Sequence, residues 1–327
     1  MNWTGKRTLV TGAGGFIGSH LTERLVSLGA DTRALIHYNS SGSWGNLDDS
    51  SVKNDFQIFA GDVRDPDSIS EAFKDVDVVF HLAAMVTIPY SYSAPTAYVR
   101  TNVEGTLNVL STAQKSGVDL LIHTSSSEVY GSAKYVPMDE SHPLQGQSPY
   151  SASKIGGDKM AEAFNLAFNL PVVTIRPFNT FGPRQSSRAI IPTIITQTIA
   201  SSKIKLGNLE PTRDLTFISD TVDGFIASAE YPEAIGQTIN LGTGQETSIL
   251  NLASEIIKII GNDIPVVQDE ARLRPPESEV DRLCADNTKA MDLLRWRAQV
   301  SLKEGLLHTI EWVTENIDRF KVNTYAI

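Results

Sequence analysis

The chain is poor in cysteine and in positive charge, and both shortages limit its chemistry. Cys284 is the one cysteine among 327 residues, so no disulfide forms within the chain, as is usual in a reducing compartment. We expect Cys284 to be a small buried apolar residue and not a nucleophile. The 38 acidic side chains outnumber the 28 lysines and arginines, and the resulting net charge of -10 disfavours a nonspecific nucleic-acid partner.

Long apolar runs are missing as well. No stretch is long enough to span a bilayer, and the first predicted strand begins too near the N-terminus to leave room for a signal peptide. We therefore expect a cytoplasmic protein without a membrane partner. What is present is typical of a globular chain, with 41% hydrophobic and 20% charged residues and a length that suits two packed lobes.

Predicted strands and helices alternate through the first half of the chain. The expected strands include residues 32–37, 56–60, 76–84 and 120–124, and the expected helices are 19–28, 66–74 and 96–116. Asp31 is interpreted as a loop residue between the first helix and the second strand. Such alternation predicts an α/β fold in which helices wrap a parallel sheet.

A glycine-rich turn connects the first predicted strand to the first helix. Gly12, Gly15 and Gly18 stand in a Gly-x-x-Gly-x-x-Gly spacing between apolar Leu9-Val10 and the helical pattern that follows. Strand, glycine turn and helix together place a dinucleotide pyrophosphate at a helix N-terminus, where a Cβ would obstruct the close approach of the backbone. We therefore predict that this turn binds the cofactor, together with Phe16 and Ile17.

An acidic residue is missing where NAD enzymes often hold the adenosine ribose. The second strand ends in His37-Tyr38-Asn39, with neither an acid for the ribose hydroxyls nor an arginine cluster for a 2′-phosphate. The sequence favours NAD and leaves NADP open, and it predicts no metal. Asp62 is predicted to accept a hydrogen bond from the adenine amino group. Further cofactor contacts are predicted where strands end or within helices, namely at Val63, Leu82, Ala83, Ala84, Asn102, Tyr150 and Lys154.

A catalytic constellation is predicted at the end of the fifth strand and the start of a later helix. Tyr150 and Lys154 are four residues apart and so share one helix face. An ammonium near a phenol favours the phenolate, so we expect Lys154 to lower the pKa of Tyr150. The phenolate then takes a proton from a sugar hydroxyl while hydride leaves for nicotinamide. Ser126 is expected to hydrogen-bond the same substrate oxygen, and His81 is expected to be structural.

These motifs resemble the short-chain dehydrogenase/reductase family, and within it the extended enzymes that act on nucleotide sugars. The resemblance covers nearly the whole chain and implies a Rossmann-like domain at 1–176 and a smaller substrate lobe at 177–327, with segments near 212–245 returning to the first domain. It also implies a homodimer through helices 96–116 and 150–168. The residues that it assigns to nucleotide ribose and phosphates are Asn179, Arg184, Arg213 and Arg274.

The reaction depends on Glu128 and its neighbour Ser127. Family 4-epimerases usually carry a small residue at position 128, whereas 4,6-dehydratases carry a glutamate that removes the C5 proton while the C6 hydroxyl leaves. Ser127 stands where many dehydratases have an acid, and we expect it to assist at O6. Because uronate decarboxylases also show Ser-Glu-Val-Tyr-Gly, this motif leaves them open, beside the 4-epimerases and a non-catalytic nucleotide or redox sensor.

The closest resemblance is to dehydratases of the legionaminic acid pathway. It implies a role in making cell-surface polysaccharide. It rests on residues 38–45, 135–150 and 206–214. It implies conversion of an N-acetylglucosamine linked to UDP or GDP into its 4-keto-6-deoxy form, and no residue distinguishes the two nucleotides.

Overall fold

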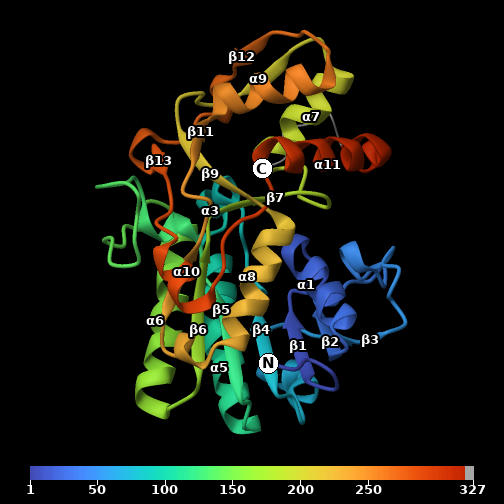
Figure 1. The fold of residues 1–327 in the computed structure, drawn as a ribbon, viewed down its shortest axis with the longest axis vertical. Helices are drawn as coiled ribbons and strands as arrows, with labels where there is room; N and C mark the ends of the chain where they lie inside the picture. The colour runs from blue at the N-terminus through green and yellow to red at the C-terminus, as the bar shows by residue number, and fades with distance from the viewer. Residues whose placement is uncertain (321–327) are drawn as a thin grey trace.

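A seven-stranded parallel sheet forms the larger half of the molecule (Figure 1). The computed structural model describes residues 1–320, and the strand order is β10-β6-β5-β4-β1-β2-β3. This order confirms the predicted α/β fold with a Rossmann-like sheet. Its strands are β1 (Arg7–Thr11), β2 (Asp31–Ile36), β3 (Phe56–Ala60), β4 (Val78–His81), β5 (Leu120–Thr124), β6 (Val172–Pro177) and β10 (Thr238–Leu241).

Helices cover both faces of this sheet because both faces are apolar. Successive strand residues point to opposite faces, so Leu9 belongs to the core cluster of α5 and α6 while Val10 belongs to the cluster of α1 and α8. The helices of this half are α1 (Phe16–Ser27), α2 (Pro66–Ile69), α3 (Ile88–Ser93), α4 (Pro95–Tyr98), α5 (Gly105–Ser116), α6 (Pro149–Phe168), α8 (Ile218–Glu230) and α10 (Thr288–Leu294).

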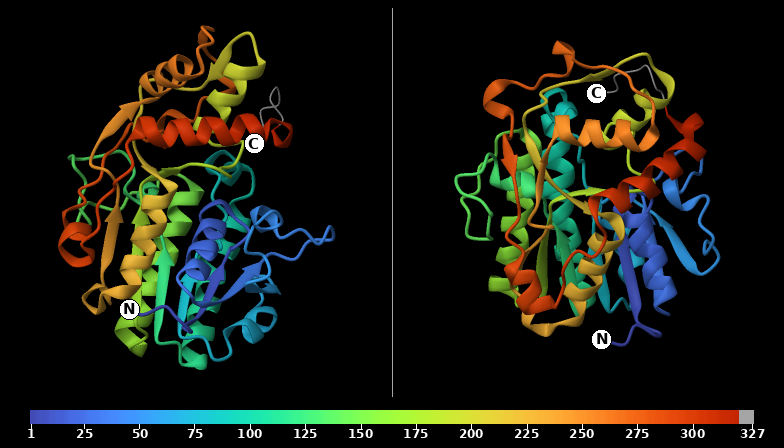
Figure 2. Two further views of the ribbon diagram at one scale, coloured as in Figure 1. Left: turned by 45° about the vertical axis from the view of Figure 1, so that its right-hand side comes forward. Right: turned by 45° about the horizontal axis from the view of Figure 1, so that its top comes forward.

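A smaller lobe lies over the carboxyl end of the sheet (Figures 1 and 2). The chain leaves the sheet after β6 to form this lobe. Its central strand β9 pairs with three others, and a two-stranded sheet joins β8 to β12. The elements of this lobe are β7 (Asn179–Phe181), α7 (Ile190–Ala200), β8 (Ile204–Leu206), β9 (Thr212–Phe217), β11 (Glu246–Ser248), α9 (Ile249–Ile260), β12 (Val266–Gln268), β13 (Arg282–Leu283) and α11 (Leu302–Glu315).

The chain returns to the large sheet after β9. Helix α8 contacts α1, and β10 pairs with β6 in parallel, with Thr238 opposite Thr174. Strand β10 therefore forms one edge of the sheet, although it comes long after β6 in the sequence. Within residues 1–320, no helix has both the length and the apolar character needed to cross a membrane.

Several predicted element boundaries differ from the structure. The first helix, expected at 19–28, is Phe16–Ser27, and the strand expected at 76–84 is Val78–His81. Asp31 opens β2, because its backbone N–H donates to Lys6 O and parallel pairing with β1 begins there. The helix expected at 66–74 is α2 followed by a 3-10 turn at Ser70–Phe73. The helix expected at 96–116 contains a π-helical stretch at Val99–Glu104, a local widening that is frequent at functional sites.

Candidate active site

The glycine turn forms a close-packed cradle at the N-terminus of α1. Gly12 has φ +69°, and a Cβ on it would lie 2.8 Å from Ala83 N. A Cβ on Gly18 would lie 2.3 Å from Gly12 O, so both positions need glycine. Gly15 caps α1 without a side-chain hydrogen bond, and the first turn has no acidic residue. The helix end therefore offers free N–H groups to an anion such as the NAD pyrophosphate.

We expect Gly18→Ala to weaken NAD binding at least about tenfold, a loss of about 1.4 kcal/mol of binding free energy. The new methyl would meet the backbone of Gly12 and shift the cradle. Titration calorimetry with NAD measures the effect. Gly117→Ala, just after the end of α5, is the control for a glycine-to-alanine change outside the cradle, because no atom lies within 4 Å of its added Cβ. Equal NAD affinity in Gly18→Ala and wild type would contradict the cradle.

The loop after β4 is held against the cradle by one hydroxyl. Thr11 Oγ1 accepts hydrogen bonds from the N–H groups of Leu82 and Ala83, each at 3.1 Å, and is bonded to His81 Nδ1 at 2.8 Å. Burial holds the pKa of His81 well below its usual value, so the ring is neutral. His81 thus has the surroundings of a structural residue. Sequence reasoning missed Thr11, although its place as the last residue of β1 was a usable signal.

Asn102 connects the same loop to the catalytic helix. Its side chain accepts from Met85 N at 2.8 Å and donates to Met85 O at 3.0 Å and to Ser153 Oγ at 2.9 Å. Asn102 lies in the π-helical stretch and is almost fully buried. All three hydrogen bonds are made to protein groups. Asn102 therefore holds the loop that includes Ala84 and Met85 against α6.

The predicted adenine contact, Asp62, is engaged by a neighbour in the structure. Arg64 Nε lies 2.9 Å from Asp62 Oδ1, and His37 Nε2 lies 3.5 Å from Asp62 Oδ2. The hydrogen bonds from Arg64 lower the pKa of Asp62. Val63 is buried in the core, so only its backbone is available to a cofactor. An adenine amino group would thus share the Asp62 carboxylate with Arg64.

Tyr150 and Lys154 lie on the first turns of α6, and both are buried. A capping box of Ser148 and Ser151 fixes the start of this helix, with Pro149 at its first position. Lys154 Nζ donates to Thr124 O at 2.5 Å, and burial lowers its pKa to about 8.

The pKa of Tyr150 differs from the sequence-based expectation. Burial raises it, a hydrogen bond with Ser126 opposes the rise, and the charge of Glu128 adds to it. The expected lowering by Lys154 is absent from the structure, because the ammonium is directed to a carbonyl at the end of β5 and burial dominates. The phenol is therefore protonated until another positive charge or a hydrogen-bond donor reaches it.

Glu128 lies on a 3-10 turn, Ser127–Tyr130, that follows β5. Ser126 caps this turn, since its Oγ accepts from Glu128 N at 3.2 Å. The Glu128 side chain is buried, and within residues 1–320 its carboxylate has no hydrogen bond. Its charge raises the pKa of Tyr150 on one side and counteracts the burial of Arg213 on the other. Ser126, Glu128 and Tyr150 therefore lie together, and Ser127, which stands between the first two in the sequence, is also buried.

Two of the predicted phosphate-binding arginines converge in the smaller lobe. Arg213 on β9 and Arg274 approach the same oxygen, Glu279 Oε1, at 3.7 and 3.3 Å. Among residues 1–320, the buried Oδ1 of Asn179 on β7 has no hydrogen-bond partner. The two arginines suit a diphosphate, whereas the free amide oxygen suits a donor such as a ribose hydroxyl. Glu279 itself was not singled out from the sequence.

Arg184 is placed apart from this pair. Its guanidinium binds both carboxylate oxygens of Glu23 on α1 at 2.9 Å, and its φ is +69°. It also lies 3.4 Å from Ser19 Oγ, near the glycine cradle. Within residues 1–320 no contact joins it to Arg213 or Arg274, so the structure puts Arg184 beside the first turn of α1.

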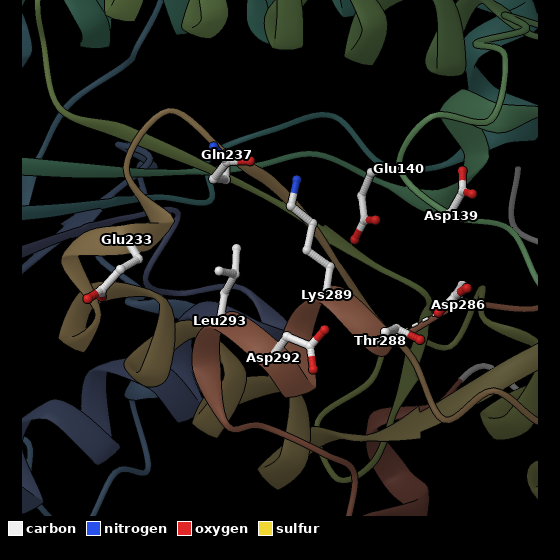
Figure 3. Close-up of a pocket in the computed structure, with 9 residues that line it drawn as sticks. All are labelled: Asp139, Glu140, Glu233, Gln237, Asp286, Thr288, Lys289, Asp292 and Leu293. Carbon is white, nitrogen blue, oxygen red and sulfur yellow. Dashed lines mark hydrogen bonds between the residues drawn. The ribbon is translucent and has the colours of Figure 1, made fainter.

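The cavity in Figure 3 lies elsewhere. Its volume is about 470 Å³, and Glu140, Asp286, Lys289 and Asp292 are among the residues that line it. It is formed around α10 and the start of β10, and it includes none of the predicted catalytic residues. The predicted catalytic residues Tyr150 and Glu128 are buried outside this cavity.

Fold and site together define a nucleotide-binding oxidoreductase-like enzyme with a Tyr-x-x-x-Lys pair. Residues 9–309 match the family model described as GDP-mannose 4,6 dehydratase. The chain belongs to this family of NAD-dependent nucleotide-sugar dehydratases and epimerases, as its extended short-chain dehydrogenase/reductase motifs predicted.

Relatives within the family catalyse different reactions. A UDP-glucose 4-epimerase of Mycolicibacterium smegmatis is 35% identical over 94% of this chain and 98% of its own length. A dTDP-D-glucose 4,6-dehydratase of Bos taurus is 31% identical over 97% of this chain and 91% of its own length. The dTDP-glucose 4,6-dehydratase DesIV of Streptomyces venezuelae, determined with NAD, superposes with a TM-score of 0.88 at 29% identity, covering 96% and 99% of the two chains. Its bound NAD bears out the predicted cofactor.

Proposed function

We propose that this enzyme is a 4,6-dehydratase that converts UDP- or GDP-N-acetylglucosamine into the 4-keto-6-deoxy sugar. The observation that supports it best is Glu128 beside Tyr150, a buried carboxylate that has no hydrogen bond from any residue in 1–320. A free base next to the oxidising tyrosine suits removal of the C5 proton, a step that an epimerase does not need. The choice of N-acetylglucosamine rests on the resemblance to the legionaminic acid pathway dehydratases.

In the proposed mechanism, the protein residues move protons while NAD, when bound, accepts a hydride and returns it. Tyr150 takes the proton of the C4 hydroxyl as C4 becomes a ketone, and Ser126 hydrogen-bonds the same oxygen. Lys154 donates to Thr124 O in this structure, so the proposed mechanism requires its ammonium to turn toward Tyr150 when cofactor and substrate bind, where it favours the phenolate. The ketone acidifies C5, so Glu128 removes the C5 proton as the C6 hydroxyl leaves with a proton as water. The hydride returns to C6, C5 takes a proton from solvent, and Tyr150 releases to solvent the proton that it took from O4, so that the enzyme ends in its starting state.

Ser127 has a limited part in this scheme. A serine hydroxyl is a weak acid, so it orients O6 and is not itself the proton source. The proton that Glu128 takes from C5 is the nearest one available to the leaving hydroxyl. We therefore assign both the base and the acid role at C5 and C6 to Glu128, with Ser127 as a hydrogen-bonding partner.

Two other reactions have specific support. The similarity to a UDP-glucose 4-epimerase favours simple inversion at C4. A uronate decarboxylase would need a cation beside C6, and Arg213 is a buried cation whose pKa is raised by the charge of Glu128, against the lowering by burial. A sensor that lacks catalysis is disfavoured by the intact Tyr150, Lys154 and Glu128.

The decisive experiment uses purified protein, NAD and deuterium oxide. UDP- and GDP-N-acetylglucosamine are incubated separately, and products are followed by mass spectrometry and NMR. We expect loss of water with deuterium at C5 for one nucleotide. Inversion at C4 without a loss of water would show an epimerase, and loss of carbon dioxide from a UDP-uronate in a parallel reaction would show a decarboxylase. No turnover of any of these substrates would contradict the proposed activity.

We also propose a homodimer, on the resemblance and on exposed apolar side chains of the two long helices. Leu107 on α5 and Leu166 on α6 are 38% and 74% exposed, and α5 packs against α6. Changing both leucines to glutamate should give a monomer, because two buried charges would be unpaired in the interface. Light scattering measures the mass. A wild type that is already monomeric would contradict the dimer.

A further inference from the structure

A buried carboxylate lies directly below the catalytic pair. Asp158 is on α6, one helical turn after Lys154 and two turns after Tyr150. It is only 4% exposed. Its Oδ2 accepts from Ser125 Oγ at 2.7 Å and from Arg176 Nη2 at 3.0 Å, and its Oδ1 lies 3.1 Å from His123 Nε2. Burying a carboxylate costs desolvation free energy, and its several hydrogen bonds both offset that cost and fix its orientation.

These partners come from the elements that carry the reactive groups. Ser125 directly precedes Ser126 at the end of β5, and His123 is on β5 itself. Arg176 on β6 also donates to Tyr130 Oη at 3.0 Å, and Tyr130 ends the turn that carries Glu128. One carboxylate therefore ties α6 to β5, β6 and the Glu128 turn.

The same carboxylate supplies charge to the site. Burial lowers the pKa of Lys154, and the negative charge of Asp158 counteracts this. The other titratable groups close to Lys154 are the rings of His81 and His123, which burial keeps neutral, and the phenol of Tyr150. Burial also opposes ionisation of Asp158, but hydrogen bonds and the charge of Arg176 lower its pKa, so it is ionised at neutral pH.

We propose that Asp158 is the positioning residue of this active site: it holds α6 in register with the end of β5 and keeps Lys154 in its charged form. The inference rests on the proposed C4 oxidation by Tyr150, a step that the dehydratase, the epimerase and the decarboxylase share. It does not depend on which of them the enzyme is.

The first test reads Lys154 directly and needs no sugar turnover. Protein labelled with carbon-13 at lysine Cε and saturated with NAD is titrated by NMR, and the Lys154 resonance is assigned with Lys154→Arg. In Asp158→Asn we expect the Lys154 titration to move about one pH unit lower, since a nearby opposite charge is lost. Glu162→Gln, one turn further along α6 and exposed, is the matched control and should leave the titration unchanged.

The second test is the pH profile of turnover with whichever sugar nucleotide the wild type converts. Lys154 is charged below its pKa of about 8, so activity that needs the ammonium falls as pH rises through that value. Asp158→Asn should move this alkaline limb lower and reduce kcat about 10- to 100-fold at an unchanged KM. Asp158→Glu keeps the negative charge, so the pH at which activity falls should return to the wild-type value while kcat stays reduced.

A separate control for misfolding is needed, because Asp158→Asn leaves the buried Arg176 without its ion pair. Asp158→Asn combined with Arg176→Gln removes both charges and should show the same lower titration. Ser125→Ala removes one hydrogen bond but no charge, so it should reduce kcat without moving the limb. A Lys154 titration equal to wild type in both asparagine variants would overturn the proposal. A wild type that turns over no sugar would count against the proposed function alone.

Discussion

Glu128→Gln should still reduce bound NAD but stall before water is lost. The amide keeps the size of the side chain and cannot take the C5 proton, so the 4-keto sugar and NADH accumulate on the enzyme. We expect product formation to fall by about 10³-fold, within the range for loss of a general base. Rapid mixing that follows NADH absorbance, together with mass spectrometry of the released sugar, separates the two steps.

The control for this variant is a second glutamate outside the site. Glu140 is half-buried, and its carboxylate accepts from Asn240 N at 2.8 Å, a bond that a glutamine also makes. Glu140→Gln should therefore behave like wild type. Turnover by Glu128→Gln at the wild-type rate would remove Glu128 from the mechanism and leave it a structural acid.

Tyr150→Phe should block the reaction one step earlier. Phenylalanine keeps the aromatic contact with Tyr98, whose ring centroid lies 6.2 Å from that of Tyr150, but it has no group to accept the O4 proton. We expect no NADH after substrate addition and a loss of about 10³- to 10⁴-fold in turnover, with NAD affinity unchanged. Calorimetry for NAD and the same rapid-mixing assay provide both readouts.

The wild-type pH dependence of this first step has a defined direction. Burial raises the pKa of Tyr150, so the phenolate fraction and the rate of C4 oxidation increase with pH as long as Lys154 stays charged, that is, below about pH 8. Exposed Tyr135 offers a control, and Tyr135→Phe should retain the wild-type profile. If Tyr150→Phe reduced NAD as fast as wild type, the proton acceptor would have to be another group.

Local patterns in the sequence were sufficient to predict the parallel sheet, the glycine cradle and the start of α6. The cradle is determined by glycines within seven residues, and α6 by a capping box next to the tyrosine. These features depend on backbone geometry and on neighbours in sequence. The position of Asp158 could also have been recognised from the sequence, because it follows Lys154 by four residues and so lies on the same helix face.

The partners of half-buried charged residues could not be predicted in this way. Asp62 pairs with Arg64, and Arg184 with Glu23 on a helix distant in sequence. Long flexible side chains choose among several nearby charges, and that choice depends on tertiary distances. The pKa of Tyr150 has the same origin, since burial is a property of the whole fold and not of the Tyr-x-x-x-Lys spacing.

The place of β10 at the edge of the large sheet limits how the enzyme can be divided. A fragment that ends at β6 would expose the N–H and C=O groups of that strand as an unpaired edge. It would also lose α8, whose buried side chains share a core cluster with α1. The nucleotide-binding half is therefore not a transplantable module. Exchanging sugar specificity between relatives requires grafting loops over the sheet, not swapping one end of the chain for another.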